Sequence, residues 1–288
     1  MTVVFSVIFP SNLPYFPSFL NSLENQTDPN FRLVLINDGV VNLEEHLAHT
    51  KILYEVIDIR DQKLSFFENR IYGLEKVLSM QARYIVFADT DDLFSSNRIA
   101  VSVKYLQKNQ FICNDISLMT HDGRLISDCF WTGRISNNSS FDCQFIRDKN
   151  LIGFGNSAMR TDNLEEMIGT LYGQSAGTDW LFFSAAKRKM QGVFLNECET
   201  LYRQHSNNLI GKGRITGDGL IGMINSKIEH YNALQKIDGD IEIDELLRTN
   251  KKLLSVLQSD PGYLDAQVTK INSSGINFFW WEESNYIN

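Results

Sequence analysis

Short apolar runs alternate with amphipathic segments through the N-terminal third of this 288-residue chain. The runs have the length and the β-branched or aromatic composition of buried strands, and the segments between them repeat apolar residues at helical spacing. This alternation predicts an α/β fold whose mixed, mainly parallel sheet is built from right-handed βα units and flanked by helices. The predicted strands cover residues 3–9, 31–36, 52–57 and 84–88, and the predicted helices cover 14–23, 64–80 and 97–108.

The pattern is less regular in the middle of the chain. Residues 110–161 mix β-like runs with turn residues, which predicts an antiparallel extension of the sheet. A helix is expected to start at Thr178 or Asp179 and to continue to about Met190, before a glycine. A further strand is expected over residues 193–202.

Helical periodicity governs the C-terminal region. From Gly217 onward, apolar residues mark two amphipathic helices, and a short third helix can follow Pro261. Four consecutive aromatic residues, Phe278–Trp281, come near the end of the chain. They are too apolar to be left in water, so they either pack back on the helices or make a subunit or membrane-surface contact. The chain therefore divides into an α/β domain over residues 1–210 and a helical extension over 211–288, in which nothing indicates chemistry.

Composition and charge narrow the class of protein. A hydrophobic fraction of 43% and a charged fraction of 22% are ordinary for a globular protein, and a net charge of −8 argues against a nucleic-acid binder. The N-terminus lacks the basic segment of a signal peptide, and no apolar run approaches the roughly 20 residues that span a bilayer. The four cysteines have no metal-finger spacing. Free thiols and a cytoplasmic location are expected.

The segment after the fourth predicted strand concentrates negative charge. Three carboxylates occur within four residues: Asp89, Asp91 and Asp92. Because ionised carboxylates are costly to bury unpaired, the strand is expected to end at about Ala88. Residues i and i+2 of an extended chain point the same way, so Asp89 and Asp91 can face one hard cation that also binds substrate phosphates. The alternative is a solvated acidic turn that caps a helix starting at Arg98.

Three of the predicted strands end in polar loops, at residues 10–12, 37–39 and 89–91. In an open parallel sheet, ligands bind beyond the carboxyl ends of the strands, so these loops are expected to form one site. Asp38 can accept hydrogen bonds from a ribose or a base, while Gly39 lets the chain turn away. An Asp-Gly pair is also among the commonest plain turns, and the residues alone leave both interpretations open.

Seven motifs, in order, resemble the inverting glycosyltransferases of family 2, which have the GT-A fold. IVFADTDDLF is similar to the metal-binding strand end of that family, and GTDWLFF resembles the motif that carries its catalytic base. The chain departs from the family pattern at Asn37, which replaces an acid, at Val40, where serine is frequent, and at Thr178, where glutamate is common. The resemblance covers about residues 3–210. The remaining motifs are FSVIFPSN, residues 21–27, LVLINDG, NRIYG and LYRQHSNN.

The resemblance implies a metal-dependent transferase of the hexosyl or N-acetylhexosaminyl type. Its expected donor is a nucleoside-diphosphate sugar, foremost a UDP-sugar, and its expected acceptor is a hydroxyl of a saccharide or glycolipid. A nucleotide-binding half over about residues 1–95 and an acceptor half over 96–210 are implied. Asp179 is the expected general base, and Asp91 with Asp89 is expected to hold Mn²⁺ or Mg²⁺. The expected nucleotide-binding residues are Pro10, Asn12, Asp38, Asn69, Asp89, Thr90 and Arg203.

Basic and imidazole side chains after the last predicted strand can add to this site. A guanidinium suits phosphate oxygens and an imidazole can ligate a metal, so Arg203 is expected near the diphosphate and His205 among the metal ligands. Lys212 and Arg214 lie in a glycine-rich stretch that can close over the phosphates. The alternative for all four is an exposed basic surface.

Two other functions account for part of the pattern. A protein that binds a sugar nucleotide without turnover is suggested by Asn37 and Thr178, although the intact acids argue against it. A phosphatase with Asp89 as nucleophile also uses Asp-x-Asp at a strand end, but that motif lies nearer the N-terminus. Assembly of bacterial surface polysaccharide or glycolipid is the setting that the resemblance implies, in the cytoplasm, with peripheral contact at the inner face of the membrane as a variant.

Overall fold

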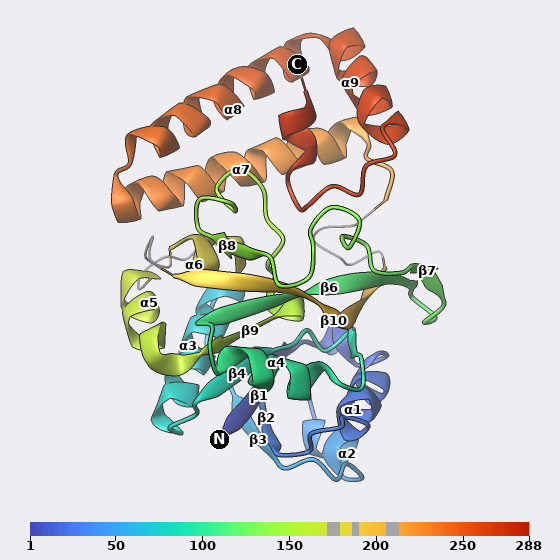
Figure 1. The fold of residues 1–288 in the computed structure, drawn as a ribbon, viewed down its shortest axis with the longest axis vertical. Helices are drawn as coiled ribbons and strands as arrows, with labels where there is room; N and C mark the ends of the chain where they lie inside the picture. Colours follow the sequence, from blue (N-terminus) through green and yellow to red (C-terminus); the bar gives the residue numbers. More distant parts are fainter. Residues whose placement is uncertain (172–178, 186–189, 206–212, 288) are drawn as a thin grey trace.

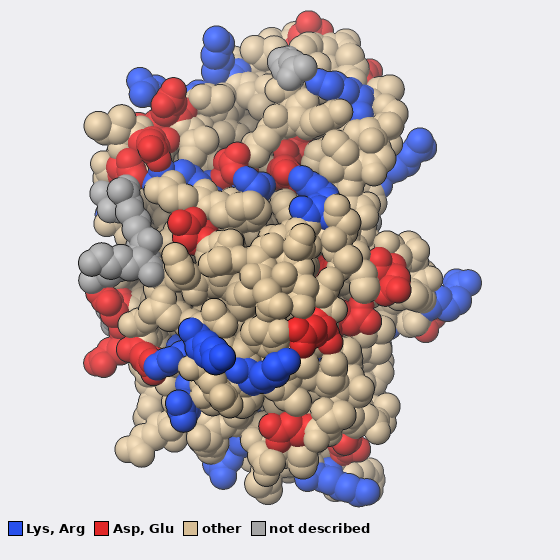
Figure 2. Space-filling model, in the orientation of Figure 1, with Lys and Arg blue, Asp and Glu red and all other residues tan. Residues whose placement is uncertain are grey.

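The computed structural model describes residues 1–171, 179–185, 190–205 and 213–287. It shows a mixed sheet with helices on both faces and a layer of long C-terminal helices beyond one side of it (Figure 1). Lysine and arginine side chains are interspersed with aspartate and glutamate over the face seen in Figure 2. The predicted α/β fold is confirmed.

The predicted N-terminal strands form the parallel half of the sheet. They are β1 (Thr2–Ile8), β2 (Phe31–Asn37), β3 (Tyr54–Asp58) and β4 (Tyr84–Phe87), in the order β3-β2-β1-β4. Every residue of β1 and β4 is buried, as expected for parallel strands that are covered on both faces. The edge strand β3 is partly exposed and begins two residues later than the apolar run predicts.

The sheet continues from β4 in the order β9-β6-β10-β5. β9 is antiparallel to both β4 and β6, while β6 and β10 are parallel to each other, so β6 and β10 run in the same direction as β1. The expected antiparallel extension is therefore only partly right, because its longest strand belongs to the parallel set. These strands are β5 (Leu93–Phe94), β6 (Phe111–Thr120), β9 (Ser157–Arg160) and β10 (Gln191–Gln204), with β7 (Leu125–Ser127) and β8 (Ser140–Asp142) paired antiparallel at the margins.

Helices cover both faces because alternate strand residues point to opposite sides. Val4 shares a core with α1, and its neighbour Phe5 shares the opposite core with α3. α3 lies close to the sheet at Gly73, where a Cβ would stand 2.6 Å from Ile36 Cγ1, which accounts for the motif glycine. The flanking helices in the described residues are α1 (Phe16–Glu24), α2 (Leu43–Leu47), α3 (Phe66–Ser79), α4 (Arg98–Leu106), α5 (Leu164–Leu171) and α6 (Asp179–Ser184).

The three C-terminal helices expected from the periodicity are confirmed as α7 (Gly217–Asp238), α8 (Ile241–Ser259) and α9 (Pro261–Ser273). Thr216 caps α7 by accepting a hydrogen bond from the Gly219 amide. The helices share a small core of their own around Leu220. None of the described helices is long and apolar enough to cross a membrane.

The terminal aromatic segment, Phe278–Trp281, packs back into the chain. Its four side chains are between 3% and 7% exposed. They contact the α/β domain as well as the helices, since Trp281 stacks on Trp180 at 4.8 Å and Trp280 lies edge-on to Trp131 at 4.7 Å. These side chains thus pack back into the chain, Phe278 in the core of the C-terminal helices and the other three in the larger core of the α/β domain.

Candidate active site

A cavity of about 450 Å³ opens beyond the carboxyl ends of β1 and β4. The predicted loops at 10–12 and 89–91 both reach it, whereas the loop at 37–39 does not. Six of the predicted site residues line it, and they include residues of the acidic loop and the first residue of α6. Those six are Asn12, Asp89, Thr90, Asp91, Asp179 and His205.

The acidic loop after β4 is held by residues from β10 and α3. The backbone amide of Arg203 donates to Asp92 Oδ1 at 2.8 Å, and His205 Nε2 lies 2.9 Å from Asp91 Oδ2. Arg70 of α3 donates to Asp89 Oδ1 at 3.4 Å. Asp92 is only 1% exposed and accepts from the Arg203 amide, yet it lines the cavity together with Asp89 and Asp91. All three acids of the loop therefore contribute to the negative charge of the cavity.

The carboxylates of the cavity are electrostatically crowded. Burial raises the pKa of Asp89 to about 6; Arg70 opposes this rise, and the nearby charges of Asp91 and Asp179 add to it. Burial, followed by the charges of Asp91 and Asp89, raises the pKa of Asp92 well above its usual value. Negative charge at this loop therefore exceeds what Arg70 neutralises, and a bound cation would relieve it.

The donor set suits a hard divalent cation. The Asp91 carboxylate and the His205 imidazole already lie side by side, and a Mg²⁺-type ion needs only one or two protein carboxylates when substrate phosphates complete its shell. The Asp89 carboxylate lies farther from this pair than a third ligand of a preformed metal site would. Within the described residues, such a tight group, with ligand atoms within 4.8 Å of one another, is formed instead by Asp128, Cys129 and Glu199, which do not line the cavity.

Two glycines bring the backbone close to the acids. A Cβ on Gly155 would stand 2.9 Å from Asp89 Oδ2, and one on Gly153 would stand 3.0 Å from Asp179 Oδ2. Both belong to the turn between the Leu151–Ile152 run and β9. Sequence reasoning did not single them out, although a Gly-x-Gly inside an apolar run is a signal of close backbone approach.

Asp179 is the first residue of α6. Its Oδ1 accepts from its neighbour's amide, Trp180 N, at 2.8 Å, and its Oδ2 accepts from Phe154 N at 3.2 Å. Burial raises the pKa of Asp179, and Arg70 and these amides oppose the rise. The predicted helix is shorter than expected: α6 ends at Ser184, and Met190 lies outside it because β10 begins at the next residue. Thr178 and residues 186–189 lie outside the described residues.

Arg203 is not placed as expected for a ligand of the diphosphate. It is 4% exposed and does not line the cavity. Its guanidinium donates to the carbonyls of Asp91 at 2.7 Å and His121 at 2.8 Å. The structure thus gives Arg203 a different task, which is to fix the backbone that presents Asp91. Arg214 is exposed, and Lys212 lies outside the described residues.

The predicted nucleotide contacts Pro10, Asp38 and Asn69 lie beside the cavity without lining it. Asn69 Nδ2 donates to Asp38 Oδ2 at 2.5 Å, and burial raises the pKa of Asp38 while this bond opposes the rise. Pro10 packs against Gly39, whose φ of +98° is one that L side chains rarely adopt. Pro10, Asp38 and Asn69 therefore stabilise the loop that follows β2.

The departure at Asn37 has a structural reason. Its side-chain oxygen accepts from Val40 N and its amide nitrogen donates to Val40 O, both at 2.9 Å. An ionised carboxylate could accept the first bond but could not donate the second. Asn37 therefore closes the turn that carries Asp38, and the replacement of an acid does not leave a gap in the site.

Replacing Asp89 by asparagine is expected to stabilise the metal-free protein near neutral pH. The pKa of Asp89 is about 6 in the folded chain, against an ordinary value of 3.8 for an exposed aspartate. The stability that the protonated group contributes is therefore full below pH 3.8 and is lost as the pH rises through 6. One third of the side chain is exposed, so screening reduces the effect to about 1–2 kcal/mol. Urea unfolding of Asp89→Asn and wild type, in EDTA, measures it.

The advantage of Asp89→Asn should shrink towards pH 4 and should reverse when Mn²⁺ is added. Asp61→Asn, an exposed carboxylate outside the cavity, is the matched control and should show neither trend. Equal stability of wild type and Asp89→Asn at neutral pH would mean that the acids are not crowded.

The C-terminal extension supplies part of the cavity wall. Ser226 of α7 and the rings of Trp280 and Trp281 line it. All three residues come after the last of the motifs discussed above. Nothing in the sequence indicated that residues 211–288 reach the candidate site. No local pattern could have shown this, because the cavity joins segments that are far apart in the sequence.

Comparison with curated proteins gives matches to uncharacterised glycosyltransferases. The chain is 28% identical to one from Rickettsia bellii over 126 residues, which are 41% of this chain and 17% of that protein. It is 27% identical to one from Rickettsia conorii over 120 residues, 39% of this chain and 18% of the relative. The chain thus spans less than a fifth of the length of these relatives.

Solved structures share the fold at low sequence identity. The match to S. aureus TarS in complex with UDP-GlcNAc has a TM-score of 0.59 at 13% identity, over 85% of this chain and 70% of that one. The match to GalNAc-T7 with UDP, GalNAc and Mn²⁺ has a TM-score of 0.55 at 12% identity, over 87% of this chain and 54% of that one. These matches confirm the expected GT-A fold. A family model described as glycosyl transferase family 2 matches residues 6–152, just over half of the chain, and the chain belongs to that family.

Proposed function

We propose that this protein is a metal-dependent inverting glycosyltransferase. It moves a hexosyl or N-acetylhexosaminyl group from a nucleoside diphosphate, foremost UDP, to a hydroxyl of a saccharide or glycolipid. The observation that carries the proposal is that one cavity joins the acidic loop after β4 to the carboxylate of Asp179. Family membership, and the UDP and UDP-GlcNAc found with proteins of the same fold, support it.

The acidic end of the cavity takes the donor. Asp91 and His205, assisted by Asp89, would hold Mn²⁺ or Mg²⁺, which would supply positive charge against the charge that develops on the leaving diphosphate. Asp89 also meets the ribose, and Asn12 and Thr90 approach the nucleotide from the cavity wall. Asp38, Asn69 and Pro10 shape the β2 loop at the nucleoside end, where Asp38 is proposed to meet the base or ribose.

Asp179 acts as the general base. Burial raises its pKa towards the working pH. This suits a general base, whose carboxylate must be ionised before the reaction and protonated after it. It accepts the proton of the acceptor hydroxyl as that oxygen bonds to the anomeric carbon and the bond to the diphosphate breaks. Attack from the face opposite the leaving group inverts the anomeric centre. The charge of Arg70 acts on both Asp89 and Asp179 and balances part of their negative charge.

The proposed division of the chain follows from these roles. Residues 1–95 carry the donor side, 96–210 carry the acceptor side with Asp179, and 211–288 form the helical extension. The extension is not separate from the catalytic domain, because it closes the cavity on the side of α6.

Thermal unfolding with nucleotides tests the proposal. UDP with Mn²⁺ should raise the melting temperature, whereas UDP with EDTA should raise it much less, because the cation joins the protein to the diphosphate. A ligand at about 100 times its dissociation constant adds about 2.7 kcal/mol of stability. GDP, dTDP and CMP serve as comparisons for the base. If no nucleoside diphosphate shifts the transition with any divalent ion, the proposal is overturned.

Release of UDP from UDP-sugars then separates a transferase from a protein that only binds. Slow hydrolysis, with water in place of the acceptor, is expected for at least one UDP-sugar in the presence of Mn²⁺. Binding without any turnover would favour the degenerate alternative.

A further inference from the structure

The wall of the cavity next to Asp179 is built by the C-terminal segment. Trp280 and Trp281 line the cavity together with Ser226 of α7. The Trp280 ring and the Asp179 carboxylate flank the same point of the backbone. A Cβ on Gly153 would stand 3.5 Å from Trp280 Cη2 and 3.0 Å from Asp179 Oδ2. An indole ring therefore lies beside the proposed base.

The position of Trp280 is fixed by the α/β domain. Its backbone pairs with Asn150 in both directions, at 2.7 and 2.8 Å. The Asn150 amide group bonds to Ile152, which ties this bridge to the turn that carries Gly153. Residues 150–153, which approach the acids, thus also position Trp280. Trp280 comes more than a hundred residues after this segment in the sequence.

Trp281 is connected to the helix of the base. Its ring stacks on Trp180 at 4.8 Å and 14°, and Trp180 stacks on His230 of α7 at 3.6 Å and 5°. Trp180 directly follows Asp179 in α6. This row of flat rings joins α7, α6 and the C-terminal segment, so that the orientation of α6 and the wall of the cavity depend on each other.

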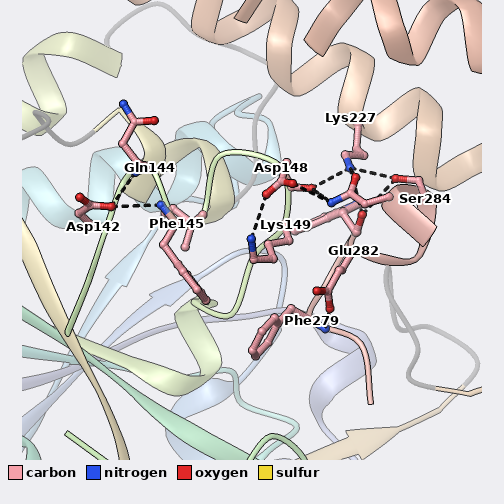
Figure 3. A network of polar contacts seen from close by, with 12 residues as sticks. Asp142, Gln144, Phe145, Asp148, Lys149, Lys227, Phe279, Glu282 and Ser284 are labelled. Carbon is pink, nitrogen blue, oxygen red and sulfur yellow. Dashed lines mark hydrogen bonds and ion pairs between the residues drawn. The ribbon is translucent and has the colours of Figure 1, made fainter. Parts of the chain in front are cut away.

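A buried lysine of α7 holds the C-terminal aromatic segment in place through hydrogen bonds (Figure 3). Lys227 is 1% exposed, and its ammonium donates to the Trp281 carbonyl at 3.1 Å and the Asp148 carbonyl at 2.7 Å, as well as to Ser284 Oγ at 2.9 Å. Trp281 has a φ of 62°, which is unfavourable for a bulky residue and persists only where the surroundings hold it. The wall is therefore preorganised, as a binding surface must be to avoid an ordering cost.

Building on the proposed transferase function, we propose that Trp280 and Trp281 form the acceptor subsite, which binds a pyranose ring of a saccharide. The C–H faces of a pyranose are apolar and its hydroxyls radiate from the edge, so an indole wall beside a few polar groups matches it. A sugar on this wall has a hydroxyl within reach of Asp179, while the donor occupies the acidic end. The geometry thus assigns acceptor recognition to a segment outside the family motifs.

Binding of simple sugars tests the subsite without relying on turnover. Methyl pyranosides of glucose, galactose and N-acetylglucosamine are titrated by ligand-observed NMR into protein saturated with UDP and Mn²⁺. The wild type should bind at least one of them. Trp280→Ala should weaken that binding about tenfold or more, while the dissociation constant of UDP stays within about twofold.

A second variant keeps the test decisive if Trp280→Ala does not fold, since removing a buried tryptophan is costly. Ser226→Trp fills the cavity from an exposed position of α7 and should weaken the same sugar as strongly. Asn225→Trp adds equal bulk at the neighbouring exposed position, which does not line the cavity, and should leave binding unchanged.

The outcomes distinguish this inference from the proposed function. If UDP binds but no methyl pyranoside does, or if Ser226→Trp leaves sugar binding unchanged, the acceptor subsite is wrong while the transferase stands. If neither UDP nor any other nucleoside diphosphate binds, the proposed function fails first.

Discussion

Asp179→Asn is expected to slow sugar transfer by about 10²–10⁴-fold and to leave UDP binding within about twofold of the wild type. The amide has the same size and its oxygen can still accept from either Trp180 N or Phe154 N, so α6 should keep its place. It cannot take the proton of the acceptor hydroxyl. Initial rates with a UDP-sugar, and thermal shifts with UDP and Mn²⁺, measure the two effects.

The pH profile of the wild type gives an independent check on this base. Because the pKa of Asp179 is raised by burial, the carboxylate should become protonated, and kcat should fall, as pH decreases through a value above that of an ordinary aspartate. The residual activity of Asp179→Asn should lack this fall. Asp61→Asn, an exposed acid away from the cavity, should behave as the wild type. Transfer at wild-type rates by Asp179→Asn would remove Asp179 from the mechanism.

Asp91→Asn is expected to abolish the difference that Mn²⁺ makes to UDP binding, and to raise the dissociation constant of UDP in Mn²⁺ about a hundredfold. The carboxylate supplies the anionic ligand that lies 2.9 Å from the His205 imidazole, and an amide binds a hard cation much more weakly. Titration of UDP with Mn²⁺, and again with EDTA, followed by thermal shift, measures the loss.

Asp128→Asn is the matched control for Asp91→Asn. Asp128 belongs to the other group of potential ligands, with Cys129 and Glu199, which does not line the cavity. It should retain the full Mn²⁺ effect. The opposite result, with Asp128→Asn losing the effect and Asp91→Asn keeping it, would move the metal away from the cavity and refute the donor arrangement proposed above.

Local sequence was sufficient for the strands and for the acidic loop. The mostly apolar run over residues 3–9 is typical of a strand covered on both faces, and all but its last residue belong to the buried strand β1. The three carboxylates after Phe87 are expected where such a strand leaves the core, and β4 ends at Phe87. Parallel topology brings the carboxyl ends of β1 and β4 to one edge, and the loops at 10–12 and 89–91 both reach the cavity there. These conclusions depend on backbone period and burial, which neighbouring residues determine. Asp179 begins a helix, and only the family resemblance predicted it at this site.

The tertiary structure alone decided which partner each polar side chain takes. Arg203 has the chemistry of a phosphate ligand, yet its guanidinium is used by the carbonyls of Asp91 and His121, which come from distant parts of the chain. Likewise, the pattern could show that Trp280 and Trp281 must be buried, but not that they would be buried against Asn150 and Trp180 at the proposed base. Hydrophobic burial specifies that a surface is covered, whereas the identity of what covers it depends on contacts between segments that are far apart in sequence.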